Sequence, residues 1–134
     1  MLIDSDVLVW LTRGHQGAAA RLKQIGVWRI NAVTYMELAQ GCRDNSELER
    51  VKKALSTGGT AILPVNELIC ERAMRLIDRY ALSDGLRLAD ALIAATALEH
   101  GLPLLTGNIK HFGAIEGLNV EPFDRTQGAR QAVP

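Results

Sequence analysis

Carboxylate side chains stand where short apolar segments of this sequence give way to helix-like patterns. Asp4 directly follows the apolar pair Leu2-Ile3, and Asp6 opens the next helical pattern. Asp90 lies in a segment that is apolar on every side, where an ionised carboxylate is costly unless a cation or hydrogen-bond donors compensate it. These residues indicate a site for a hard divalent cation, Mg²⁺ or Mn²⁺, held by oxygen ligands.

Two later positions extend this candidate set. Glu37 follows the strand-like segment 27–30, and Thr106-Gly107-Asn108 follows Leu104-Leu105. Asn108 would orient a water molecule or contact a metal through its side-chain carbonyl, with Thr106 as an accessory residue. If the preceding segments are parallel strands, all of these groups can converge at one edge of the sheet.

Ordinary helix capping offers an alternative for the first three acids. Asp4 and Asp6 each have a residue type that favours a helix N-cap and complements the helix dipole. Thr34 and Glu37 have the spacing of a capping box, which alone would explain both residues.

Asp90 and Asn108 also have structural alternatives. Arg87, one turn before Asp90, could form an ion pair with it. The helix dipole could offset on the order of 1 kcal/mol for Asp90, which is not enough at a deeply buried position. Asn108 could simply tolerate the left-handed backbone of a turn. We favour a metal ligand at Asp90.

A divalent ion at such a site can polarise a phosphoryl oxygen and lower the pKa of a bound water molecule. Phosphodiester hydrolysis is therefore the reaction class that the residues favour. Four basic residues are candidates for contacts to phosphate, although for each of them a solvated surface position is the favoured alternative. They are Arg13, Arg87, Lys110 and His111.

The elements that must position these residues alternate between strand-like and helix-like segments. Strands are predicted at residues 2–3, 27–30, 61–63, 103–105 and 119–121. Helices are predicted at residues 7–11, 18–25, 34–42, 46–55 (with a capping box of Ser46 and Glu49), 66–82 and 86–100. The alternation predicts one α/β domain over residues 1–124, with a mostly parallel sheet of four to five strands and helices on both faces. Residues 125–134 are expected to form a disordered tail.

Charge and composition limit the possible partners and compartment. Fifteen basic and fifteen acidic residues give a formal net charge of zero, so any affinity for nucleic acid must come from local positive charge, a bound metal or a second subunit. Cys42 and Cys70 have no metal-binding spacing and are expected to be reduced. The charged Asp4 and Asp6 and the lack of a long apolar run favour the cytoplasm and no membrane.

Four segments, in order along residues 1–123, resemble the successive motifs of PIN-domain proteins and of VapC-type toxins within that family. They are Asp4-Ser5-Asp6-Val7-Leu8, Thr34-x-x-Glu37-Leu38, Asp90 to Ala97, and Leu105 to Phe112.

The resemblance implies that Asp4, Glu37 and Asp90 form an acidic centre for Mg²⁺ or Mn²⁺. It also implies an endoribonuclease that hydrolyses RNA phosphodiester bonds, a homodimer, and inhibition by a VapB-type antitoxin. The sequence departs from the family where Asn108 replaces a frequent acid and His111 replaces a frequent Asp, which bears on whether a second metal binds.

Two alternatives remain open from the sequence. Asp4-Ser5-Asp6 is similar to the nucleophile motif of haloacid-dehalogenase-type phosphatases, but Asp90 has no adjacent acid of the kind that those enzymes pair near a late strand. A PIN fold could also bind a partner without catalysis, although the intact set of Asp4, Glu37 and Asp90 opposes this. Hydrolysis of RNA and of phosphomonoesters would discriminate the three functions.

Overall fold

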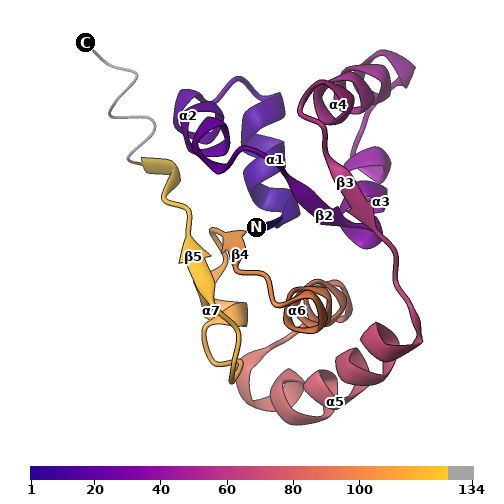
Figure 1. The fold of residues 1–134 in the computed structure, drawn as a ribbon, viewed down its shortest axis with the longest axis vertical. Helices are drawn as coiled ribbons and strands as arrows, with labels where there is room; N and C mark the ends of the chain where they lie inside the picture. Colours follow the sequence, from indigo (N-terminus) through magenta and orange to yellow (C-terminus); the bar gives the residue numbers. More distant parts are fainter. Residues whose placement is uncertain (127–134) are drawn as a thin grey trace.

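Five short parallel strands form one sheet at the centre of the structure, a computed structural model that describes residues 1–126 (Figure 1). The strands pair in the order β3-β2-β1-β4-β5, and each of these pairings is parallel. The strands are Leu2–Ile3 (β1), Arg29–Asn31 (β2), Ala61–Leu63 (β3), Leu104–Thr106 (β4) and Val120–Pro122 (β5). The predicted parallel α/β class is confirmed.

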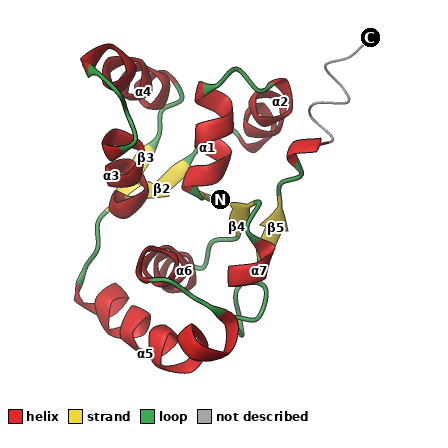
Figure 2. Ribbon diagram, turned by 180° about the vertical axis from the view of Figure 1, so that it is seen from behind, coloured by secondary structure: helices red, strands yellow, loops and turns green. Residues whose placement is uncertain are grey.

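Helices connect the strands and cover both faces of the sheet (Figures 1 and 2). Leu2 packs in the apolar cluster of α5 and α6, whereas Ile3 packs in the cluster of α1 to α4, because successive strand residues point to opposite faces. The helices are Ser5–Thr12 (α1), Gln16–Ile25 (α2), Ala32–Gln40 (α3), Asn45–Thr57 (α4), Glu67–Asp84 (α5), Leu88–His100 (α6) and Ile109–Phe112 (α7).

The strand order places a switch point between β1 and β4. From β1 the chain moves outward to β2 and β3, and after α5 and α6 it returns to β4 on the other side of β1 and continues to β5. In open parallel sheets, ligands bind at the carboxyl ends of the strands beside such a point. Asp4 follows β1 and Thr106 ends β4, so both residues lie at this position.

The second strand and its following helix differ in position from the prediction. Val27 is exposed, and the indole Nε1 of Trp28 donates to the backbone oxygen of Leu22 in α2, although the backbone oxygen of Trp28 still accepts from the N–H of Ala61 in β3. The strand begins at Arg29. The helix begins at residue 32 rather than 34, because the side chain of Asn31 accepts a hydrogen bond from the backbone N–H of Val33 and caps α3.

Two further elements depart from the sequence prediction. The predicted Ser46–Glu49 capping box is wrong, because Asp44 is the N-cap of α4 and accepts from the backbone N–H of Glu47. The short helix α7 was not predicted, since four residues are too few to show a helical period. Its last residue, Phe112, is fully buried and anchors α7 in the core. By contrast, the predicted cap Asn66 of α5 is confirmed.

Arg125 and Thr126, the first residues of the predicted tail, belong to the described part of the chain. The backbone oxygen of Arg125 accepts a hydrogen bond from Nε2 of His15 at 2.8 Å. The rest of the predicted tail, residues 127–134, lies outside the described residues. Within residues 1–126, none of the helices has both the length and the apolar character required to cross a bilayer.

Candidate active site

Asp4 is fixed at the carboxyl end of β1 by two hydrogen bonds. Its Oδ1 accepts from the backbone N–H of Ser5 at 2.8 Å, so Asp4 caps α1, as the capping alternative proposed. Its Oδ2 accepts from the hydroxyl of Thr106 at 2.7 Å, which joins the ends of β1 and β4. Asp4 is only 6% exposed. A single carboxylate thus serves as a helix cap and as part of the switch point.

Asp6 lies in the first turn of α1 and is not its cap. Its Oδ2 accepts from the backbone N–H of Gly107 at 2.9 Å, whereas its Oδ1 is buried with no hydrogen-bond partner among the described residues. A Cβ at residue 107 would lie 2.8 Å from Asp6 Oδ2 and 3.2 Å from the backbone oxygen of Phe123. Glycine is therefore required for Asp6 to approach the turn after β4.

Glu37 lies in the middle of α3 and points to the start of α1. Its Oε1 accepts from the hydroxyl of Ser5 at 3.3 Å. The alternative that Thr34 and Glu37 form a capping box is wrong, because Asn31 caps α3 and Thr34 is buried inside the helix. Glu37 is consequently free of a capping role and faces the same region as Asp4.

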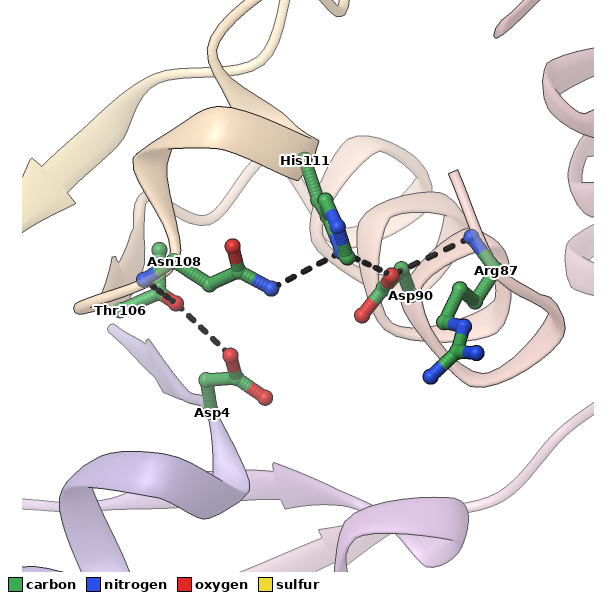
Figure 3. Close-up of polar contacts among 6 residues, drawn as sticks. All are labelled: Asp4, Arg87, Asp90, Thr106, Asn108 and His111. Atoms are coloured by element: carbon green, nitrogen blue, oxygen red, sulfur yellow. Dashed lines mark hydrogen bonds and ion pairs between the residues drawn. The ribbon is translucent and has the colours of Figure 1, made fainter. Parts of the chain in front are cut away.

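Asp90 is the third residue of α6 and faces Asp4 across the site (Figure 3). Its Oδ2 accepts from the backbone N–H of Arg87 at 3.2 Å and lies 2.9 Å from Nδ1 of His111. The alternative of an Arg87–Asp90 ion pair is wrong, since the Arg87 guanidinium makes no such pair within residues 1–126. The Asp90 side chain is 15% exposed and remains open to the site.

Thr106 and Asn108 connect the two sides of the site. The hydroxyl of Thr106 donates to Asp4 and accepts from the backbone N–H of Asn108 at 3.0 Å. The side-chain Nδ2 of Asn108 lies 2.9 Å from Nδ1 of His111, the nitrogen that also contacts Asp90. Figure 3 shows Asn108 and His111 between the two carboxylates, above the space that Asp4 and Asp90 face.

The predicted phosphate contacts fall in different places. His111 lies against Asp90, and Arg87 is the N-cap residue of α6, so both lie beside the site. Lys110 is exposed on α7 next to His111. Arg13 is not brought to the site, because it lies at the far end of α1, where its guanidinium is 5.8 Å from the Trp10 ring centre.

The carboxylates Asp4, Asp6, Glu37 and Asp90, which we call the acidic centre, destabilise one another's charged forms. Burial, with the nearby charges of Asp6 and Asp90, raises the pKa of Asp4 to about 7, against the opposing effect of its hydrogen bonds from Thr106 and Ser5. Burial also raises the pKa of Asp6 and of Glu37, and the charge of Asp90 contributes to both shifts. The site is therefore a region of concentrated negative potential.

The donor chemistry of the acidic centre fits a hard divalent cation. Carboxylate oxygens are the ligands that Mg²⁺ and Mn²⁺ prefer, and the buried Oδ1 of Asp6 is an acceptor that no donor of residues 1–126 reaches. Among residues 1–126, no three His, Cys, Asp or Glu side chains form a ready-made ligand cluster. Mg²⁺ commonly binds through one or two carboxylates and keeps several water molecules, so such an ion does not require three preformed protein ligands.

Several residues of the site were not predicted from the sequence. Ser5 joins Glu37 to α1, and Gly107 donates to Asp6. Fully buried Asn31 donates through its side chain to the hydroxyl of Thr96, which links the start of α3 to the middle of α6. The polar Thr96 in an apolar helix was the one sequence signal of this link.

The comparisons with known proteins agree on one protein family. The sequence model of the PIN domain matches residues 1–118. Ribonuclease VapC1 of Rickettsia felis is 34% identical over an alignment that covers 90% of this chain and 93% of the relative. Ribonuclease VapC10 of Mycobacterium tuberculosis is 36% identical, with 92% of each chain covered. A solved toxin–antitoxin complex from Klebsiella pneumoniae contains a chain with a TM-score of 0.78 and 34% identity, covering 92% of this chain and 98% of that one.

Proposed function

Since the chain belongs to the PIN-domain family, we propose that it is a metal-dependent endoribonuclease of the VapC type, the toxin of a toxin–antitoxin module. The observation that carries this proposal is the acidic centre, in which Asp4 is 6% exposed and has a pKa of about 7 beside three further carboxylates. A cluster of this kind is unfavourable in the empty protein and becomes favourable when a divalent cation binds.

We assign direct metal contact to Asp4, Glu37 and Asp90, and an accessory role to Asp6 and Thr106. The ion, Mg²⁺ or Mn²⁺, would supply a Lewis acid and a bound water of lowered pKa. Thr106 and the N–H of Ser5 fix both oxygens of Asp4, so that its lone pairs keep one orientation.

His111 and Asn108 act on the opposite side of the site. His111 holds one oxygen of Asp90, and Asn108 lies within reach of a water molecule or phosphate between the two carboxylates. Arg87 and Lys110, beside this space, are available for phosphate oxygens of the RNA.

A similar solved structure supports a protein partner. The similar Klebsiella chain comes from a toxin–antitoxin complex, so we propose that a VapB-type antitoxin binds this chain. We further propose a homodimer and a cytoplasmic location.

Cleavage of structured RNA by the purified chain tests the proposed function. We expect cleavage with Mg²⁺ or Mn²⁺, none with EDTA, and loss of cleavage in Asp90→Asn. Asp78→Asn, an exposed aspartate of α5, is the matched control and should cleave as the wild type does.

Three other results would contradict this proposal. Hydrolysis of a phosphomonoester such as p-nitrophenyl phosphate, without RNA cleavage, would point to the phosphatase alternative suggested by Asp4-Ser5-Asp6. Absence of hydrolysis with every metal would favour an interaction module. RNA cleavage that persists in EDTA would exclude the metal-dependent mechanism.

A further inference from the structure

A cavity of about 600 Å³ lies away from the acidic centre, between the end of α1, the residues after α3 and the first turns of α4. We call it the arginine pocket, because its charged lining residues are Arg13, Arg43, Arg50 and Glu47. These side chains give the lining a net charge of +2 (three arginines against one glutamate) in a chain whose formal net charge is zero. The pocket is thus a local concentration of positive charge.

The arginines of this pocket keep donors available. Arg43 uses its Nε to bind Glu47 at 2.6 Å, and its side chain is 87% exposed, which leaves its terminal nitrogens open. Within residues 1–126, neither Arg13 nor Arg50 forms an ion pair. Guanidinium groups with free terminal nitrogens bind phosphate oxygens in a forked geometry.

Helix electrostatics alone does not explain these arginines. A cation at the end of α1 is favoured by the helix dipole, which accounts for Arg13. Arg43 precedes α4 and pairs with Glu47 in its first turn, and Arg50 lies in its second turn, where the dipole has little effect. The dipole therefore leaves Arg50 unexplained, and a guanidinium that forms no ion pair within residues 1–126 favours an anionic ligand.

The arginine pocket is connected to the acidic centre along two helices. Ser5 and Glu37 join α1 and α3 at the acidic centre. Val9 and Arg13, four and eight residues after Ser5, and Gly41, four residues after Glu37, all line the pocket. Residues with this spacing lie on one helix face, so the two helices, which contact each other, run from one site to the other. Eight helical residues span about 12 Å.

We propose that the arginine pocket binds a backbone phosphate of the RNA strand whose scissile bond lies at the acidic centre, an inference that rests on the proposed function. At the roughly 3.4 Å per nucleotide of a stacked strand, the separation corresponds to about three or four nucleotides. The acidic centre repels a polyanion until a cation binds, and a positive pocket at this distance provides the attraction that the neutral chain lacks.

Single-phosphate replacement in the substrate tests this proposal. The cleavage site of a single-stranded RNA is first mapped with the wild-type chain and Mn²⁺. A series of the same RNA, each with one neutral methylphosphonate linkage, is then titrated by fluorescence anisotropy with Mn²⁺, every protein carrying Asp90→Asn to prevent cleavage. The proteins are the wild type, Arg13→Gln/Arg50→Gln and the control Arg75→Gln, an exposed arginine of α5 on the other face of the sheet.

We expect the wild type and Arg75→Gln to lose affinity when the neutral linkage lies about three or four nucleotides from the cut. The double variant should bind the unmodified RNA about tenfold more weakly at 0.1 M salt and be insensitive to that linkage. The slope of its log affinity against log salt concentration should decrease by about 0.7 for each phosphate that the variant no longer binds.

Equal sensitivity of all three proteins to every linkage would overturn the phosphate pocket while leaving the nuclease proposal intact, because the wild type would still cleave. A wild type that neither cleaves nor binds RNA would overturn both proposals. Unchanged RNA affinity in the double variant, combined with loss of binding to a glutamate-rich peptide, would assign the pocket to a protein partner and overturn the RNA contact.

Discussion

The acidic centre and the arginine pocket are joined by the same two helices but differ in their electrostatic state. Asp4 caps the start of α1 and Glu37 lies in the middle of α3, whereas Arg13 and Gly41 follow the last residues of these helices. In α1 the negative charge of Asp4 at the start and the positive charge of Arg13 at the end both have the sign that the helix dipole favours. Asp4 is nevertheless buried with a raised pKa, whereas the Arg43 side chain is 87% exposed.

This difference separates a site that opposes folding from one that does not. Buried like charges make the metal-free acidic centre unfavourable, so its residues are better explained by the binding of a cation than by stability. Exposed arginines in water have little effect on stability in either direction. A substitution in the acidic centre should therefore change both stability and function, whereas a substitution in the arginine pocket should change function alone.

The largest expected effect is on catalysis at the acidic centre. Asp4→Asn removes a charge that would hold the divalent ion, and we expect RNA cleavage to fall about 10³-fold, the loss typical for removal of a major electrostatic group. The cap of α1 is retained, because the amide oxygen of Asn can still accept from Ser5. Initial rates at saturating Mn²⁺ measure the change, and an unchanged rate would remove Asp4 from the active site.

The pH dependence of stability gives the next largest effect. Asp4 has a pKa of about 7 in the folded chain and 3.8 as a model group, so between these values the folded state binds the proton more tightly. Stability therefore falls as the pH rises from 4 to 7, by on the order of 3 kcal/mol, and the loss persists above pH 7. Asp4→Asn should lack this contribution.

Urea unfolding in EDTA from pH 4 to 8 measures this effect as the difference between Asp4→Asn and the wild type. The single acceptor oxygen of Asn cannot replace both carboxylate oxygens, and without the hydrogen bond from Thr106 the variant loses about 1 kcal/mol at every pH. The variant should thus be less stable than the wild type at pH 4 and more stable at pH 8. A difference that does not change with pH contradicts the raised pKa, and Asp78→Asn should show none.

Sequence patterns predicted the positions that follow strands. Asp4 and Thr106 were found because each marks a change from an apolar segment to a polar one. Asp90 was found because it is a charge inside an apolar helix. The parallel sheet followed from the alternation of elements, and the structure confirms it. These features depend on local composition, which a single sequence contains.

Contacts between distant segments could not be predicted in the same way. Gly107 and Asp6 are 101 residues apart, and Ser5 and Glu37 are 32 apart. Such pairs depend on the strand order, in which β4 inserts beside β1, and local patterns do not contain that order. The two predicted capping boxes were wrong for a related reason, because Asn31 and Asp44 compete with Thr34 and Ser46 as plausible caps and only the tertiary packing selects between them.

Glycines near the two sites provide a smaller and sharper contrast. In Gly107→Ala the added Cβ would lie 2.8 Å from Asp6 Oδ2, so Asp6 must move, and we expect a loss of about 1–2 kcal/mol in stability together with reduced cleavage. In Gly41→Ala, beside the arginine pocket, the nearest atom is the Glu37 backbone oxygen at 3.4 Å, which is tolerated.

Thermal unfolding of the two glycine variants at pH 8 checks this contrast. Gly107→Ala should recover part of its stability when combined with Asp6→Ser, because the shorter side chain removes the close approach. Equal losses in the single and double variants would show that the contact with Phe123, and not that with Asp6, requires glycine at residue 107.

The smallest expected effect is on stability at the arginine pocket. Arg13→Gln/Arg50→Gln removes two exposed cations that form no ion pair within residues 1–126, so urea unfolding should change by less than about 0.5 kcal/mol at any pH from 5 to 8. Arg75→Gln should behave alike. A loss of more than about 1 kcal/mol in the double variant alone would mean that these arginines stabilise the end of α1 and the first turns of α4, and the contrast between the two sites would then fail.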